Sequence, residues 1–476
     1  MTTQEITVKY VYLLAAVLFI VGLKMLGNVK SAPRGNMVSA FGMLLATAAT
    51  LFLITGATAI SLVWIGIALA IGAMAGLYLA LKTSMTNMPQ MVALLNGFGG
   101  IASLLVASGD YLNKTDAQLA TTQGYMLLTT GLAVLIGGVT FTGSLVAFGK
   151  LQGLKITPGR PIQFAGQKPL IGLLVFLGIL LSIMLIGQPS AGWMIGLSVV
   201  ASLMLGVLLV IGIGGADMPV VISLLNSYSG LAAAMAGFVL NNNALIITGS
   251  LVGASGIILT NIMCKAMNRS LANVLFGGVG FEATTSGPTS AVASNHGGGS
   301  VRELSAEDAA IQLEAASLVI VVPGYGMAVA QAQHGVSELA QALENRGITV
   351  KYAIHPVAGR MPGHMNVLLA EANVPYEQLC DLETINPEFE QASVALVIGA
   401  NDVTNPAARH DKDSPIYGMP ILDVDKARSV IVIKRSLNPG FAGIENELHF
   451  HPSCGMLFGD GKTMVNALVA ELNETA

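Results

Sequence analysis

Charge is scarce in this chain of 476 residues, because only 11% of its side chains are Asp, Glu, Lys or Arg while 53% are hydrophobic. That composition excludes a disordered or collagen-like protein and differs from that of a protein surrounded only by water. Cysteine is also scarce. Cys264, Cys380 and Cys454 are scattered and odd in number, which excludes a disulfide scaffold.

The few charges are unevenly divided along the chain. Residues 1–270 carry 12 Lys and Arg against 4 Asp and Glu, whereas residues 271–476 carry 11 against 23. Neither part is typical of a nucleic-acid binder. We therefore expect two domains of different kinds: a helical multi-pass membrane domain followed by a water-facing, acidic domain.

Nine stretches of residues 1–270 are long and apolar enough to cross a bilayer, which takes roughly 20 residues each. They lie near 8–26, 37–55, 59–81, 88–108, 124–148, 170–187, 191–212, 219–240 and 244–267. Their flanks carry an unequal number of basic residues. One side has Lys24, Lys30, Arg34, Lys82, Lys150, Lys155, Arg160, Lys168, Lys265 and Arg269, and the other only Lys9 and Lys114. This bias predicts that the C-terminal half is cytoplasmic.

An internal repeat links the fourth and eighth stretches. Residues 87–100 and 217–230 are identical at 6 of 14 positions, including the Met-Pro pair that opens each one. The next long apolar stretch in each case contains Thr-Gly-Ser-Leu-Val, at 142–146 and 248–252. We interpret the repeated unit as a pair of helices, and two such pairs can line one pathway.

Polar residues inside these stretches have two interpretations each. Asn96 and Asn226 lie about 10–12 Å along their helices. They either join helices through hydrogen bonds, with small residues such as Ser255 and Gly256 at close contacts, or line a hydrated proton path. Asp217 precedes Met218-Pro219, so it either caps a helix or relays a proton at the mouth of the path.

Glycine, serine and threonine dominate residues 277–300, and this composition indicates a flexible linker. We place the whole linker at residues 271–300. Short apolar runs follow at 317–322, 348–354, 394–398, 430–433 and 456–458, separated by helical stretches. Such alternation predicts an α/β domain over 301–476, with a doubly wound parallel sheet of the Rossmann type.

The segment 323–330, Pro-Gly-Tyr-Gly-Met-Ala-Val-Ala, follows the first of these runs. Gly324, Gly326 and Val329 give a Gly-x-Gly-x-x-Val pattern between a strand and a helix that we expect to continue to about Arg346 and to stop at Gly347. Such glycines allow backbone to approach a pyrophosphate. The alternative is a tight strand-to-helix turn.

Charge favours NADP over NAD as the nucleotide. The second strand ends at His355 without the acidic residue that binds a free ribose hydroxyl. Lys434, Arg435 and Ser436 follow the run at 430–433, where two cations and a hydroxyl suit a phosphate monoester. The alternative is an exposed basic pair. Loops 355–364 and 399–406 are either further parts of the ligand site or simple loops, and neither shows the spacing of a metal site.

Several long motifs resemble the beta subunit of proton-translocating NAD(P) transhydrogenase: the repeated Met-Pro helices, MCKAMNRS at 263–270, VPGYGMAVAQAQ at 322–333, HPVAGRMPGHMNVLLAEA at 355–372, IGAND at 398–402 and KRS at 434–436. The resemblance implies a proton-translocating membrane domain over 1–270 and an NADP(H)-binding domain over 301–476. It also implies a bacterial inner membrane and an alpha subunit that binds NAD(H) and contributes its own membrane helices. A dimer of alpha–beta units is expected. Hydride would pass directly between the two cofactors, so no catalytic side chain and no metal is expected.

The resemblance also assigns individual residues. Gly324, Tyr325, Gly326, Ala328 and Val329 match the fingerprint loop, and Arg360, Asn401 and Asp402 match cofactor-site loops. Lys434, Arg435 and Ser436 match the site of the 2′-phosphate, and residues 438–443, with Asn438, Gly440 and Phe441, match a loop that covers the nucleotide. Asn96, Asp217, Asn226, Ser255 and Gly256 are assigned to proton coupling.

Two positions depart from the pattern of the family. Asn96 stands where many relatives have His, and Phe441 where many have Tyr. Because Asn does not titrate, we expect a titratable side chain of the alpha subunit to face Asn96 and Asn226.

Two other classes of function remain open. One is a transporter or channel with a regulatory NADP(H)-sensing domain. The other, a membrane-anchored reductase, would need haem-binding histidines in the membrane, and all seven histidines lie beyond residue 295.

Overall fold

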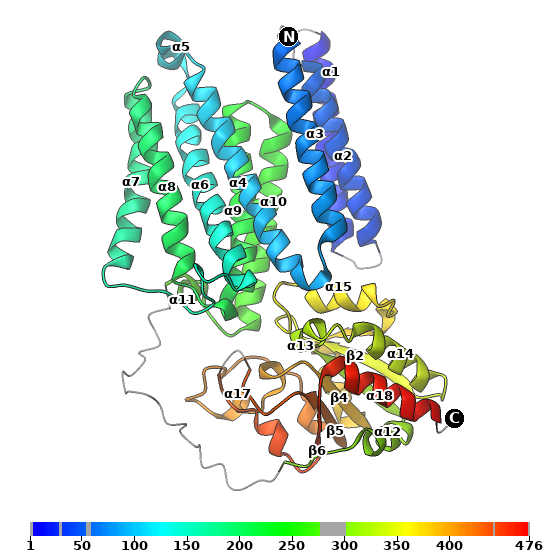
Figure 1. The fold of residues 1–476 in the computed structure, drawn as a ribbon. Helices are drawn as coiled ribbons and strands as arrows, with labels where there is room; N and C mark the ends of the chain where they lie inside the picture. The colour runs from blue at the N-terminus through cyan, green and yellow to red at the C-terminus, as the bar shows by residue number, and fades with distance from the viewer. Residues whose placement is uncertain (1–2, 28–30, 54–58, 277–300, 441–442, 475–476) are drawn as a thin grey trace. The chain divides into compact units, whose positions relative to one another are not determined.

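The computed structural model describes residues 3–27, 31–53, 59–276, 301–440 and 443–474 (Figure 1). The chain forms two compact units, one of Met1–Gly215 with Val221–Thr260 and the other of Ala216–Val220 with Asn261–Ala476. The expected linker core at 277–300 lies outside the described residues. The domain limits at 270 and 301 remain predictions.

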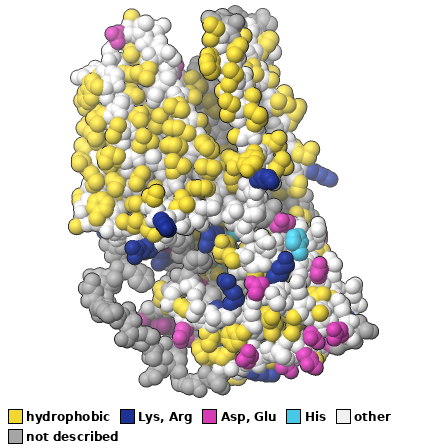
Figure 2. All heavy atoms as spheres, in the orientation of Figure 1, with side chains coloured by type: hydrophobic (Ala, Val, Ile, Leu, Met, Phe, Trp, Pro, Cys, Tyr) yellow, Lys and Arg dark blue, Asp and Glu magenta, His cyan; other side chains and the backbone are white. Residues whose placement is uncertain are grey.

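Within the described residues, nine helices are long and apolar enough to span a membrane, which confirms the nine predicted stretches. On the face drawn in Figure 2, hydrophobic side chains cover much of the surface of these helices, as expected for surfaces that face lipid. They are α1 Thr3–Leu26, α2 Ala32–Leu53, α3 Ala59–Lys82, α4 Met88–Leu112, α6 Gly124–Gln152, α7 Gln167–Gly187, α8 Gly192–Ile211, α9 Met218–Val239 and α10 Asn243–Ala266. Two short helices are α5 Asp116–Thr121 and α11 Leu271–Phe276.

The internal repeat is visible in the structure. Each Met-Pro helix follows a single 3-10 turn, η1 Met85–Asn87 before α4 and η2 Gly215–Asp217 before α9. The proline occupies the first turn of its helix, where its missing N–H leaves no hydrogen bond broken.

The same repeated glycine lies at a close approach of the backbones within each helix pair. A methyl group at Gly100 of α4 would lie 2.7 Å from the carbonyl oxygen of Gly137 in α6. At the equivalent Gly230 of α9 it would lie 2.8 Å from the carbonyl oxygen of Gly249 in α10. These contacts confirm that each Met-Pro helix packs against the next long helix.

The second unit contains a six-stranded parallel sheet in the order β3-β2-β1-β4-β5-β6. This is the doubly wound order, in which the chain changes direction across the sheet between β1 and β4. The fold prediction is therefore confirmed. The strands are β1 Leu318–Pro323, β2 Thr349–Ile354, β3 Leu379–Asp381, β4 Val394–Ile398, β5 Ser429–Lys434 and β6 Cys454–Phe458.

Short helices connect the strands, and buried Val, Ile and Leu side chains of β1, β4 and β5 form the centre of the core. The helices are α12 Ala306–Glu314, α13 Tyr325–Val329, α14 Gln333–Glu344, α15 His364–Glu371, α16 Leu382–Ile385, α17 Ala407–His410 and α18 Gly461–Glu474. The 3-10 turns are η3 Tyr376–Gln378, η4 Asn386–Gln391, η5 Asp402–Thr404, η6 Val424–Lys426 and η7 Glu447–Phe450.

Two sequence predictions about this sheet need correction. Strand β3 was not predicted, because its three residues are too few to show an apolar run. The single helix expected from the fingerprint loop to Arg346 is divided into α13 and α14. The division lies at Gln331, whose φ of 51° is left-handed and breaks the helical hydrogen-bond pattern.

Candidate functional site

The fingerprint loop and the loop after β4 lie together at the switch point of the sheet. Strands β1 and β4 are neighbours, and their carboxyl ends lead into Gly324 and Gly399 respectively. In doubly wound sheets, ligands bind at this edge and at this position. The structure thus brings together two loops that the sequence analysis assigned separately.

The glycines of the fingerprint loop have a role that the sequence analysis did not state. Their N–H groups donate to the last residue of β4 and to the residue after it, from Gly324 to the carbonyl of Ile398 and from Gly326 to that of Gly399, both at 2.9 Å. A methyl group at Gly324 would lie 2.3 Å from the Gly399 oxygen, and one at Gly326 would lie 2.7 Å from the Gly399 Cα. Both residues must be glycine because the two loops are in backbone contact.

Helix α13 has only five residues, so its dipole adds little to anion binding. Within α13, Ala328 is fully buried and Val329 is 51% exposed.

Three side chains form a stack beside the fingerprint loop. The guanidinium carbon of Arg360 lies 4.3 Å from the centre of the Tyr325 ring, a cation–π contact. The ring of Tyr325 lies 5.9 Å from that of His364, and His364 Nδ1 accepts from the N–H of Arg360 at 3.1 Å. The structure therefore places Arg360 of the second loop directly against the fingerprint loop.

Lys434 ends β5 and faces the loop after β4. Its ammonium donates to Oδ1 of Asn401 at 2.7 Å, and Nδ2 of Asn401 donates to Oδ1 of Asp402 at 2.9 Å. Burial lowers the pKa of Lys434, and the charge of Asp402 opposes this shift. Gly440 completes the cluster, because a methyl group there would lie 2.6 Å from both Asn401 Nδ2 and Asp402 Oδ1.

The remaining assigned residues lie on the surface next to this cluster. Arg435, Ser436 and Asn438 are exposed, with their side chains available to a ligand. Phe441 lies outside the described residues.

His355, directly after β2, is a buried structural residue: Nε2 lies 2.8 Å from the carbonyl oxygen of Pro420, and Nδ1 accepts from the N–H of Val357 at 3.2 Å. Burial lowers its pKa to about 4.

In the membrane-type helices, Asn96 is buried and its Nδ2 donates to the carbonyl of Ile222 in α9 at 3.3 Å. The two repeat copies α4 and α9 are therefore in contact. Asn226, one turn further along α9, is half-buried. Ser255 Oγ donates within its own helix to Val252, at 3.0 Å.

Gly256 lies at the tight crossing of α9 and α10. A methyl group there would lie 2.8 Å from the Cα of Ser227. Hydroxyl groups join the same two helices, since Ser227 Oγ donates to the carbonyl of Gly253 at 2.6 Å and Ser223 Oγ to that of Gly256 at 3.3 Å.

Asp217 makes an ion pair that sequence reasoning missed. Nη1 of Arg269 donates to both carboxylate oxygens, at 2.8 and 2.7 Å, although Asp217 is only 9% exposed. Burial raises the pKa of Asp217, while Arg269 opposes that rise. The signal that was available is that both residues flank apolar stretches on the same predicted side of the membrane.

Lys150 was counted among the exposed flanking charges, but it is only 5% exposed. Its ammonium donates to three carbonyl oxygens, those of Ile211 at 2.8 Å, Ile213 at 2.7 Å and Arg160 at 3.3 Å. Ile211 is the last residue of α8 and Ile213 lies two residues beyond it, at a helix end where carbonyls lack partners within the helix and a cation is favourable. Lys150 is therefore a capping residue of α8.

Nine apolar helices joined to a doubly wound sheet with a glycine loop at its switch point define a multi-pass membrane protein with a dinucleotide-binding domain. Comparison with known proteins specifies the family. The NAD(P) transhydrogenase beta subunit family matches residues 8–471. Two relatives named NAD(P) transhydrogenase subunit beta, from Rhodospirillum rubrum and from one strain of that species, are each 51% identical over 465 residues, 97% of this chain and 98% of the relative.

The chain belongs to the NAD(P) transhydrogenase beta subunit family. It is the membrane and NADP-binding part of that enzyme, whose beta family binds NADP(H). A beta subunit implies an alpha partner.

Proposed function

We propose that residues 301–476 bind NADP(H) across the switch point, with the 2′-phosphate at Lys434, Arg435 and Ser436. The observation that carries this proposal is the half-buried ammonium of Lys434, held 2.7 Å from Asn401 Oδ1 at the end of β5. A phosphate monoester carries about two charges at neutral pH and suits this cation and the neighbouring Arg435. No acidic residue follows β2 to favour the unphosphorylated ribose.

The other assigned residues surround the same edge. Gly324 and Gly326 bring the fingerprint loop against β4, with Tyr325, Ala328 and Val329 following in α13. Arg360, stacked on Tyr325, supplies a third cation beside Lys434 and Arg435. Asn401 accepts from Lys434 and donates to Asp402, and both side chains lie against Gly440. Gly440 belongs to the segment 438–443, with Asn438 and Phe441, that we assign to covering the nucleotide.

Bound NADP(H) supplies the hydride chemistry, and the alpha subunit holds the NAD(H) with which hydride is exchanged. This chain's residues then act by positioning and by excluding water.

We further propose that residues 1–270 couple this reaction to proton movement. Asn96, Asn226, Ser255 and Gly256 lie at or beside the contacts among α4, α9 and α10, and Asp217 opens α9. The titratable group facing the two asparagines comes from the alpha subunit. One charge moving through about 150 mV releases roughly 3.5 kcal/mol, about 2.5 decades in an equilibrium ratio.

The ten-to-two bias of flanking Lys and Arg supports a cytoplasmic C-terminal domain in a bacterial inner membrane. Assembly as a dimer of alpha–beta units is part of the same proposal.

The decisive experiment mixes the purified full-length chain with its alpha subunit, NADH and an NADP analogue, and follows hydride transfer by absorbance. Transfer that needs both subunits is expected. A chain that binds the nucleotide without supporting transfer would instead be a nucleotide sensor.

A further inference from the structure

Two buried asparagines lie beside the Lys434 cluster, Asn405 and Asn446, with exposed fractions of 0% and 2%. Neither was assigned by the sequence analysis. A buried side-chain amide is costly unless its polar atoms are paired, so its partners indicate its role.

Asn446 holds the main chain of Asn401. Its Nδ2 donates to the carbonyl oxygen of Asn401 at 2.9 Å and to Oγ1 of Thr404 at 3.2 Å. Oγ1 of Thr404 donates to the same carbonyl at 2.9 Å. Asn446 Oδ1 accepts from the N–H of Leu448 at 3.0 Å, which caps η7. The Asn401 carbonyl is thus held by two side-chain donors, in addition to the backbone N–H of Thr404 at 3.2 Å.

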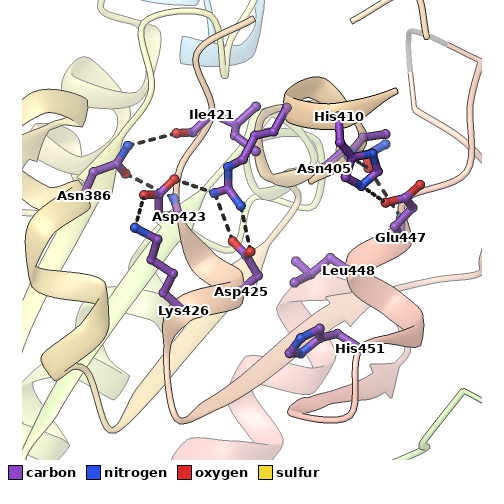
Figure 3. Close-up of polar contacts among 12 residues, drawn as sticks. Asn386, Asn405, His410, Ile421, Asp423, Asp425, Lys426, Glu447, Leu448 and His451 are labelled. Carbon is purple, nitrogen blue, oxygen red and sulfur yellow. Dashed lines mark hydrogen bonds and ion pairs between the residues drawn. The ribbon is translucent and has the colours of Figure 1, made fainter. Parts of the chain in front are cut away.

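Asn405 makes the reciprocal connection. Its Nδ2 donates to the carbonyl of Glu445 at 2.9 Å, and its Oδ1 accepts from the N–H of Glu447 at 3.4 Å. Figure 3 shows Asn405 reaching toward Glu447, beside His410 of α17. Each asparagine therefore bonds the backbone of the other's loop, and segments 401–405 and 445–448 are joined as one piece.

The joined piece carries the side chain that holds Lys434. Asn401 has φ −143° and ψ −77°, and its carbonyl oxygen accepts from Thr404 within the loop and from Asn446 outside it. Its Oδ1 accepts from Lys434, and the direction of that bond follows from the position of the Asn401 backbone.

We propose that Asn446, together with Asn405, is a positioning residue that sets the selectivity of this chain for a phosphorylated nucleotide. It acts through the backbone of Asn401, which directs the Lys434 ammonium to the phosphate. This inference rests on the proposed function, which places the 2′-phosphate at Lys434.

The test is Asn446→Ser in the full-length chain, with NADP+ and NAD+ titrated by calorimetry. Serine retains the capping oxygen for Leu448 but is too short to reach Asn401. NADP+ affinity should fall about 5- to 20-fold, the equivalent of one to two hydrogen bonds, while NAD+ affinity changes less than about twofold.

The matched control is Asn386→Ser. Asn386 also bonds backbone on both sides, to the carbonyl of Ile421 at 3.0 Å and from the N–H of Asp423 at 3.1 Å (Figure 3). Both partners precede β5 in the chain and belong to neither 401–405 nor 445–448. The Asn386→Ser variant should have a lower unfolding temperature but an unchanged ratio of NADP+ to NAD+ affinity. If Asn446→Ser weakened both nucleotides equally, its role would be structural and the inference would be overturned.

Two further variants keep the outcomes distinct. If Asn446→Ser does not fold, Thr404→Val, which removes the other side-chain donor to the Asn401 carbonyl, decides by the same ratio of NADP+ to NAD+ affinity. Lys434→Met separates this inference from the proposed function. If Lys434→Met leaves the ratio of NADP+ to NAD+ affinity unchanged, the phosphate site itself is refuted. If Lys434→Met changes this ratio and Asn446→Ser does not, only the positioning role of Asn446 is refuted.

Discussion

Replacing Gly256 by alanine tests the packing of α9 against α10. The added methyl group would lie 2.8 Å from both Cα and Cβ of Ser227, about 1 Å closer than carbon atoms normally approach. Backbone contacts of this kind cannot be relieved by a side-chain rotation, so the helices must separate. Overpacking costs about 1–3 kcal/mol, and weakening two interhelical hydrogen bonds adds roughly 0.6 kcal/mol each. We expect a total loss of roughly 2–4 kcal/mol.

The assay is unfolding of the detergent-solubilised full-length chain, with Gly172→Ala as the control. Gly172 lies in α7 with no atom within 4 Å of the added methyl group. Alanine there should leave stability unchanged or raise it by about 0.5–1 kcal/mol, because it is the better helix former. If Gly256→Ala were as stable as Gly172→Ala, the close backbone contact between α9 and α10 at Gly256 would be contradicted.

Two other predictions concern buried titratable residues. Lys150→Met should lower the free energy of unfolding by about 2–4 kcal/mol, because three carbonyl oxygens lose the ammonium as a donor, although that of Ile211 keeps the N–H of Ile162, whereas the exposed Lys155→Met should change it by less than about 0.5 kcal/mol. Equal effects in denaturant titrations of the two variants would exclude the capping role. For His355, the folded-state pKa of about 4 lies below the ordinary value near 6.5, so the unfolded chain binds the extra proton. Stability should therefore fall as pH decreases from about 6.5 to 4, by roughly 3 kcal/mol in all, and calorimetry should find a shallower decline in His355→Gln, which retains a donor for Pro420. The same slope in both proteins would contradict a neutral, buried His355.

The sequence predicted elements with a strong periodic signal and missed contacts that depend on the fold. Nine apolar stretches and five buried runs are each long enough to be recognised locally. Strand β3 is too short to be recognised from its local sequence, and no glycine or proline at Gln331 indicates that the helix breaks there. Lys150 looked like an ordinary flanking charge, because its burial depends on carbonyls more than 50 residues away.

In the candidate site, too, local motifs were predicted from the sequence and contacts between distant segments were not. The fingerprint glycines and the Lys434 segment were found from motifs, yet the contact of Gly324 with β4 and the pairing of Asn405 with Asn446 arise only when distant loops meet. Asp217 illustrates a partial success. Its position at the start of α9 was predicted, whereas its pairing with Arg269 required the fold.

The central claim is that this chain holds the phosphorylated nucleotide at the carboxyl edge of its sheet. Calorimetric titration of the full-length chain with NADP+ and with NAD+ tests it directly. Charge-assisted contacts at Lys434 and Arg435, worth about 1.5–3 kcal/mol each, predict that NADP+ binds at least about 100-fold more tightly. Equal affinity for the two nucleotides would contradict the account.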